Sequence, residues 1–337
     1  MARIAINGFG RIGRQTFKAA WNKPGFNVVA INDLTDAKTL AHLLKYDTNY
    51  GKWGVSVKAG KDFIVVGKKK IPIFAEKDPA NLPWKKYKVD VVIESTGFFV
   101  TEEAASAHLQ AGAKRVIISA PAKGGNVPTY VLGANTTGYD YKEKAAIINN
   151  ASCTTNCVAP ITAILHEAFG VKKALMSTVH GYTSTQRLVD GPHKDLRRAR
   201  AAAVNIIPTS TGAAIATTET IPDLKNKFDG ISIRVPILTV SLMDGTYLLK
   251  RKTTVEEINK FIIAATKKPR WKDLVGYTDE PLVSVDFVGD PRSAIVDLGM
   301  TRIVDGDLVK VVAWYDNEWA YALRLAEMAL FVAKAFK

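Results

Sequence analysis

Two cysteines lie four residues apart in the stretch INNASCTTNCVAP, which spans residues 148–160. Cys153 follows an apolar run and begins a stretch with helical spacing, and Cys157 falls one turn later on the apolar side of that expected helix. Unpaired backbone N–H groups and the helix dipole lower the pKa of a thiol at a helix start. We therefore expect Cys153 to be a reactive nucleophile and Cys157 to be a buried packing residue.

A metal site and a disulfide are the other common uses of a cysteine pair. The chain holds only these two cysteines, and its five histidines are scattered along the sequence. A zinc site needs about four ligands, usually paired at short spacing. A disulfide across one turn of a helix would be strained. We expect neither a metal nor a disulfide here.

A nucleophilic thiol also needs a base, and His180 is the candidate. It ends the strand-like run ALMSTVH, residues 174–180, and the loop GYTSTQ follows it. Ends of adjacent strands meet at one edge of a sheet, so a pair between Cys153 and His180 is geometrically feasible. A histidine at a strand end is often merely packed, and the spacing alone leaves both interpretations open.

Three glycines near the N-terminus have the spacing of a dinucleotide-binding loop. Gly8, Gly10 and Gly13 follow the expected strand 3–6 and open the expected helix 11–21, which is the context this motif requires. Gly8 would allow a tight turn, Gly10 the close approach of a pyrophosphate, and Gly13 close packing of helix on strand. The helix N-terminus would supply N–H groups and partial positive charge.

An acidic residue completes this motif at the end of the second expected strand, residues 27–32. Asp33 lies there, where a carboxylate accepts hydrogen bonds from a ribose diol and repels a 2′-phosphate. Leu34 adds bulk where that phosphate would lie. The pattern predicts NAD as the preferred cofactor over NADP.

The elements that must position these groups change in character along the chain. Apolar runs alternate with amphipathic helical stretches up to residue 150, which predicts an α/β domain with a Rossmann-type, doubly wound parallel sheet at 1–150. Longer alternating runs, including 231–251 and 307–316, predict an α+β catalytic domain with a large mixed or antiparallel sheet at 151–316. We expect the C-terminal helix, 317–337, to pack back onto the first domain.

Composition describes a globular protein with a basic surface. Apolar residues make up 47% of the chain, charged residues 23%, and the net charge is +14. No apolar run approaches the roughly 18 residues that span a bilayer, and the N-terminus lacks the features of a signal peptide. We expect no membrane association and a cytoplasmic location. The lysines and arginines are dispersed, so a nucleic-acid partner is disfavoured, although a basic nucleic-acid-binding protein is the competing class of function.

Six motifs together resemble the phosphorylating glyceraldehyde-3-phosphate dehydrogenases. They are, in order, INGFGRIGR, ASCTTNC, HGYTSTQ, IIPTSTGAA, RVP and WYDNEW, and the resemblance runs from residue 3 to residue 336. It implies a glycolytic and gluconeogenic oxidoreductase that converts D-glyceraldehyde 3-phosphate, inorganic phosphate and NAD to 1,3-bisphosphoglycerate. Cys153 would form a thiohemiacetal and then a thioester, with His180 as general base and acid. A relative with the same thiol chemistry, erythrose-4-phosphate dehydrogenase, is the nearer alternative.

The resemblance also implies binding residues and an assembly. Substrate and inorganic phosphate would be held by hydroxyl, amide and guanidinium groups, namely Ser152, Thr154, Thr183, Arg197 or Arg198, Thr211, Gly212 and Arg234. Further cofactor contacts would come from Arg11, Ile12, Lys77, Ser119 and Asn317. The family resemblance implies a homotetramer.

Overall fold

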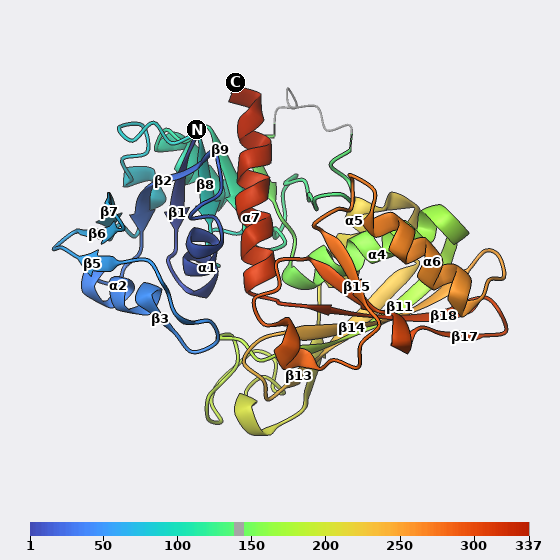
Figure 1. The fold of residues 1–337 in the computed structure, drawn as a ribbon. Helices are drawn as coiled ribbons and strands as arrows, with labels where there is room; N and C mark the ends of the chain where they lie inside the picture. Colours follow the sequence, from blue (N-terminus) through green and yellow to red (C-terminus); the bar gives the residue numbers. More distant parts are fainter. Residues whose placement is uncertain (138–144, 337) are drawn as a thin grey trace. The chain divides into compact units, whose positions relative to one another are not determined.

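The computed structural model describes residues 1–137 and 145–336 (Figure 1). Residues 138–144 fall within the predicted first domain and residue 337 ends the predicted terminal helix, and both lie outside the described residues. The chain divides into two compact units. The first unit comprises Met1–Tyr130, Gly138–Ala151 and Ala322–Lys337, and the second comprises Val131–Thr137 and Ser152–Tyr321.

A largely parallel sheet forms the core of the first unit. Its strand order, among the described residues, is β10-β9-β8-β1-β2-β7-β6-β5, and pairing is parallel from β10 through β7. Only β6 and β5 pair antiparallel at one edge. The strands are β1 (Ala2–Asn7), β2 (Phe26–Asn32), β5 (Val57–Ala59), β6 (Phe63–Val66), β7 (Lys69–Phe74), β8 (Val91–Glu94), β9 (Arg115–Ile118) and β10 (Ile147–Asn149). This sheet confirms the predicted Rossmann-type fold.

Capping residues mark where the helices of the first unit begin. Asp36 caps α2 by accepting a hydrogen bond from the N–H of Thr39, and Thr101 caps α3 in the same way. The helices are α1 (Arg11–Ala19), α2 (Ala37–Lys45), α3 (Glu102–Gln110) and most of α7 (Trp319–Val332). A salt bridge of 2.7 Å from Lys23 to Glu327 joins α7 to the segment that follows α1. Short elements are β3 (Tyr46–Asp47), β4 (Gly51–Lys52), η1 (Pro79–Asn81) and η6 (Ala333–Phe336).

The second unit is built on a mixed sheet, as predicted. The strand order is β12-β13-β11-β14-β18-β16-β15, and β17 pairs with β18. The strands are β11 (Val171–Gly181), β12 (Ile207–Ser210), β13 (Phe228–Val235), β14 (Ser241–Leu249), β15 (Val275–Thr278), β16 (Ala294–Asp297), β17 (Arg302–Val304) and β18 (Leu308–Tyr315). The alternating run at 231–251 contains two strands, because Pro236 lacks an N–H for the ladder and Val240 adopts a φ of 67°.

Three α-helices lie against this second sheet (Figure 1). They are α4 (Cys153–Phe169), α5 (Ala213–Thr220) and α6 (Val255–Thr266), with short turns η2 (Ala202–Val204), η3 (Pro222–Leu224), η4 (Ser284–Phe287) and η5 (Leu298–Met300). Helix α5 was not predicted, because its sequence AAIATTET has almost no amphipathic pattern; it packs its small residues against α4. In the described part of the chain, no helix combines the length and apolar character needed to cross a bilayer.

Candidate active site

Cys153 is the first residue of α4, as the sequence predicts. Ser152 caps this helix, and its Oγ accepts a hydrogen bond of 3.1 Å from the N–H of Thr155. The preceding residue, Ala151, has a φ of 53°, a conformation that turns the chain sharply from β10 into the helix. Cys157 is fully buried one turn later within the apolar core, and both cysteines are free thiols. The two thiols therefore have different surroundings, and only Cys153 lies partly exposed at the helix start.

His180 lies beside this thiol. Its Nε2 is 3.4 Å from the Sγ of Cys153, and its side chain is almost completely buried near the end of β11. From the sequence spacing alone, His180 could equally be a packed residue or the partner of Cys153. The distance places His180 in direct contact with Cys153, in a geometry suited to proton transfer between sulfur and nitrogen.

The other ring nitrogen of His180 is held by two groups. Nδ1 lies 2.6 Å from the carbonyl oxygen of Gly181 and 2.8 Å from a guanidinium nitrogen of Arg234. The parallel register of β11 and β13 pairs His180 directly with Arg234, which explains how residues 54 positions apart meet. In the tautomer that carries its proton on Nδ1, this N–H donates to the carbonyl of Gly181, and Arg234 donates to the same carbonyl at 3.0 Å and not to Nδ1. The lone pair of Nε2 then faces the thiol and can accept its proton.

Burial determines the protonation of this pair in the absence of substrate. It raises the pKa of the Cys153 thiol, although the Arg234 guanidinium and hydrogen bonds at the helix start act in the opposite direction. The expectation of a lowered thiol pKa is therefore wrong for the protein alone, because desolvation outweighs the helix start. Burial, with Arg234 next, lowers the pKa of His180 from its usual 6.5 to about 3. Both shifts favour the neutral thiol and the neutral imidazole at pH 7.

A buried tyrosine hydroxyl joins the helix that carries the thiol to two strands. The Oη of Tyr315, at the end of β18, lies 2.8 Å from the Oγ1 of Thr154 and 2.8 Å from the Oγ1 of Thr178 on β11. Burial raises the pKa of Tyr315 well above its usual range, so this hydroxyl stays neutral. Thr154 was a predicted phosphate ligand, but its hydroxyl is buried in this contact.

Arg198 lies closer to the His180 site than Arg197. Its guanidinium donates to the Oγ1 of Thr209 at 2.8 Å and to the carbonyl of Ser210 at 3.1 Å. It also lies near enough to lower the pKa of both His180 and Arg234 by electrostatic repulsion. The side chain of Arg197 is exposed, so Arg198 is the better placed of the two arginines that the sequence left open.

The remaining predicted phosphate residues lie in three places of the second unit. Thr211 and Gly212 precede α5, where the Oγ1 of Thr211 accepts a hydrogen bond of 3.2 Å from the N–H of Ala213. Thr183 follows β11, and its hydroxyl contacts that of Thr185 at 2.9 Å. Ser152 shares a 2.8 Å contact between its hydroxyl and that of Thr155, and its position adjoins Cys153. Hydroxyls and helix N-termini of this kind bind anions.

In the first unit, the glycine loop borders a pocket of about 420 Å³. Gly8 has a φ of +88°, and a side-chain carbon there would lie 2.7 Å from the backbone nitrogen of Thr96. A side chain at Gly13 would overlap the carbonyl oxygen of Gly8, whereas one at Gly10 would meet only open space. Gly8 and Gly13 thus shape the turn, and Gly10 leaves room for a ligand against the main chain.

The pocket lies at the carboxyl ends of β1, β8 and β2, where the strand order reverses direction. Asp33 lines it, and its carboxylate accepts hydrogen bonds from the N–H of Phe9 at 2.7 Å and of Thr35 at 2.9 Å. Leu34 and Lys77 also line this pocket. The sequence patterns did not predict its other lining residues, which are Asn7, Asn32, Glu76, Ser95, Thr96, Phe98 and Phe99. The stretch STGFF after β8 was the available signal for the last four, because it follows a strand of the same sheet.

Five predicted cofactor residues do not line this pocket, and one of them is Gly13, which shapes the turn instead. Arg11 and Ile12 are the first residues of α1, where backbone N–H groups point out of the helix, but the Arg11 side chain pairs with Asp47 at 2.8 Å. Ser119 follows β9 in the first unit. Asn317 belongs to the second unit, where its Oδ1 accepts a hydrogen bond of 2.8 Å from Ser241.

The pocket fits a dinucleotide in its chemistry. It combines an open main-chain approach at Gly10, the start of a helix and an acidic side chain at the end of β2. These are the groups that hold a pyrophosphate and a ribose diol in nucleotide-binding sheets.

Comparisons with known proteins find relatives of both parts of the chain. Residues 2–102 match the family model for the glyceraldehyde 3-phosphate dehydrogenase NAD-binding domain, and residues 152–317 match that for its C-terminal domain. Similar curated proteins include glyceraldehyde-3-phosphate dehydrogenase 1 of Bacillus cereus, with 51% identity over 98% of each chain. The enzyme of Geobacillus stearothermophilus is 50% identical over 98% of each chain, and that of Borreliella burgdorferi is 49% identical over 98% of this chain and all of its own.

Proposed function

The chain belongs to the glyceraldehyde-3-phosphate dehydrogenase family, and we propose how its residues divide the work of that reaction. The protein is an NAD-dependent, phosphorylating oxidoreductase of glycolysis that acts on glyceraldehyde 3-phosphate. The observation that carries the division of roles is the 3.4 Å contact between the Sγ of Cys153 and the Nε2 of His180. Cys153 is the nucleophile, and His180 is its proton acceptor and donor.

The first step joins the sulfur of Cys153 to the aldehyde carbon. As the S–C bond forms, the thiol proton passes to Nε2 of His180, and the carbonyl oxygen then takes that proton to give a thiohemiacetal. Both groups are neutral beforehand, because burial opposes either charge alone. The proton therefore leaves sulfur as the carbon arrives. The backbone N–H of Cys153 at the helix start is a candidate donor to the developing oxyanion.

Oxidation leaves a thioester on Cys153. His180 takes the hydroxyl proton of the thiohemiacetal while the carbon gives up its hydride. Bound NAD supplies the hydride acceptor, held in the first unit by the glycine loop, Asp33 and the start of α1. A thioester retains enough free energy to drive acyl-phosphate formation, whereas an oxygen ester would not.

Phosphorolysis then releases the product. A phosphate oxygen attacks the thioester carbon, the C–S bond breaks, and His180 returns its proton to the sulfur of Cys153. Arg234 is placed to neutralise phosphate charge because it already contacts His180 at 2.8 Å. We assign Arg234 and Thr183 to the phosphate of the substrate, with Arg198 as a third group there. We assign Ser152, Thr211 and Gly212 to the attacking phosphate. Thr154 can contribute its backbone N–H to this phosphate site, because its hydroxyl is already in contact with the hydroxyl of Tyr315.

We also propose the homotetrameric assembly and cytoplasmic location that the family resemblance implies. The similarity to known dehydrogenases supports the enzyme activity, and the assembly rests on the family resemblance alone. Sedimentation equilibrium of the purified protein tests the tetramer, and a monomer at micromolar concentration would contradict it.

The reaction itself is tested by the absorbance of NADH. Purified enzyme with glyceraldehyde 3-phosphate and NAD should produce NADH continuously when inorganic phosphate is present. Without phosphate we expect one burst, about one NADH for each active site, because the thioester has no acceptor. A folded protein without phosphate-dependent turnover would exclude this function.

A further inference from the structure

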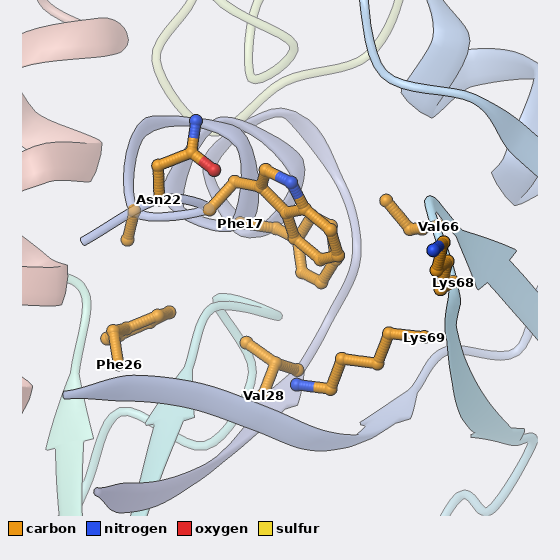
Figure 2. A pocket seen from close by; sticks show the side chains of 9 residues that line it. Phe17, Asn22, Phe26, Val28, Val66, Lys68 and Lys69 are labelled. Carbon is orange, nitrogen blue, oxygen red and sulfur yellow. The ribbon is translucent and has the colours of Figure 1, made fainter. Parts of the chain in front are cut away.

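The first unit contains a second pocket, separate from the glycine loop, with a volume of about 550 Å³ (Figure 2). It lies between the end of α1, strand β2 and the β6–β7 hairpin. None of its lining residues belongs to the pocket beside the glycine loop. The dehydrogenase reaction assigns it no role.

Aromatic and aliphatic side chains form the apolar part of this pocket. Phe17, Phe26, Val28 and Val66 are buried there. Trp21 is half-buried and lines the same space, with its ring centroid 5.3 Å from that of Phe17 and 5.7 Å from that of Trp53. The indole is held on two sides by other rings, so it offers a fixed surface to a planar ligand.

The charged part of the pocket is entirely basic. Lys68 and Lys69 line it, and none of the nine lining residues is acidic. The ammonium of Lys69 is half-buried and donates a hydrogen bond to the Oδ1 of Asn27, a neutral partner. Burial, and then the charge of Arg3, lower the pKa of Lys69, which shows that positive charge is poorly compensated there. A cation of this kind beside an apolar wall attracts an anion that carries an apolar body.

We propose that this pocket is a binding site for a small aromatic anion, a ring bearing a phosphate or carboxylate group. The ring packs on Trp21 and Phe17, and the anionic group pairs with Lys69 and, at the rim, with Lys68. The site is independent of the catalytic thiol, so its ligand is neither substrate nor cofactor.

The chain offers a matched control for the test. Lys70 is adjacent in sequence, but its ammonium lies 3.8 Å from the ring centroid of Phe63, and it does not line the pocket. Lys69→Met and Lys70→Met therefore change the net charge equally, but only Lys69→Met removes a charge from this site. Lys69→Arg keeps the positive charge at the site.

Phenyl phosphate is the probe, titrated into the full-length enzyme by calorimetry. Saturating NAD and inorganic phosphate are present throughout, so that the cofactor and catalytic phosphate sites are occupied. We expect Lys69→Met to weaken binding at least about tenfold, and Lys70→Met and Lys69→Arg to change it less than about threefold. Benzyl alcohol and methyl phosphate, which carry the ring and the charge separately, should each bind at least about tenfold more weakly than phenyl phosphate.

Several outcomes overturn the proposal. These are no binding of phenyl phosphate to the wild type, equal losses in Lys69→Met and Lys70→Met, or binding of either half-probe as tight as that of phenyl phosphate. Turnover and thermal midpoint of each variant verify that it is folded. If Lys69→Met does not fold, Lys68→Met at the exposed rim replaces it, with an expected loss of about fivefold against less than about threefold for Lys70→Met, and equal losses overturn the proposal.

Discussion

The two units present their functional groups by different means. In the first unit, the cofactor pocket is shaped by main chain, since Gly8 and Gly13 leave no space for a side chain and Gly10 exposes the backbone. In the second unit, the partly exposed thiol of Cys153 and the buried imidazole of His180 act through side chains whose pKa values depend on their surroundings. The first site is therefore sensitive to added atoms, and the second to changes in charge and proton affinity.

The largest expected effect is at the thiol. Cys153→Ser should lower turnover by at least about a thousandfold, because an alcohol is a far weaker nucleophile and an oxygen ester does not transfer its acyl group to phosphate. Cys157→Ser, in the core one turn behind, should retain most turnover and lose some thermal stability. Steady-state NADH formation measures both. Equal losses of turnover would show that the two cysteines do not have separate roles.

Removing the base should have the next largest effect. His180→Gln retains a polar side chain but cannot accept the thiol proton, so kcat should fall by about a hundredfold to a thousandfold. Alkylation of Cys153 by iodoacetamide at pH 7 should slow as well, because the neutral thiol loses the base that accepts its proton. The matched control is the same alkylation measurement on Cys157→Ser, which keeps both Cys153 and His180. An unchanged alkylation rate would mean that His180 does not promote ionisation of the thiol.

Alanine at two glycines separates architecture from binding in the first unit. Gly13→Ala should lower the free energy of unfolding by about 3 kcal/mol, because the added carbon overlaps the carbonyl of Gly8. Gly10→Ala has open space and should keep the thermal midpoint, while raising the KM for NAD about tenfold by blocking the approach of the pyrophosphate. Thermal unfolding and NAD titration distinguish the two. A Gly10→Ala enzyme with unchanged KM would remove this residue from the cofactor site.

The pH dependence of stability tests the second unit without any substrate. His180 has a pKa of about 3 when folded and 6.5 when unfolded, so the unfolded chain binds one more proton between these values. The wild type should therefore lose stability as pH falls from about 6.5 toward 3, and His180→Gln should lose less over the same range. Urea unfolding at pH 7 and pH 5 gives this difference. A steeper loss in the variant would show that folded His180 is protonated.

The smallest effect is expected at Asp33. This carboxylate supports the loop through the N–H of Phe9 as well as facing the pocket. Asp33→Asn removes the charge and keeps an acceptor oxygen, so discrimination against NADP should fall about tenfold with little change in the KM for NAD. Asp33→Gly should also raise the KM for NAD. The ratio of kcat/KM for the two cofactors is the measurement, and an unchanged ratio in both variants would exclude a ribose contact.

The sequence patterns predicted those features of the two sites that depend only on residues close together along the chain. The glycine spacing, Asp33 and the cysteine at a helix start are local features, and the structure places each at the expected element. The contact between His180 and Arg234 depends on the register of two strands, which spacing does not reveal. The direction of the Cys153 pKa was predicted wrongly, because the local pattern contains the helix start but not the burial.

The hydroxyl of Tyr315 has a consequence for how the enzyme fails on heating. It holds the residue after the thiol and the residue two before the imidazole, so one buried group fixes the spacing of both reacting atoms. Tyr315 is itself part of the main apolar core of the second unit. The alignment of sulfur and nitrogen is therefore as durable as that core, and the second unit should keep Cys153 and His180 in contact until its core melts.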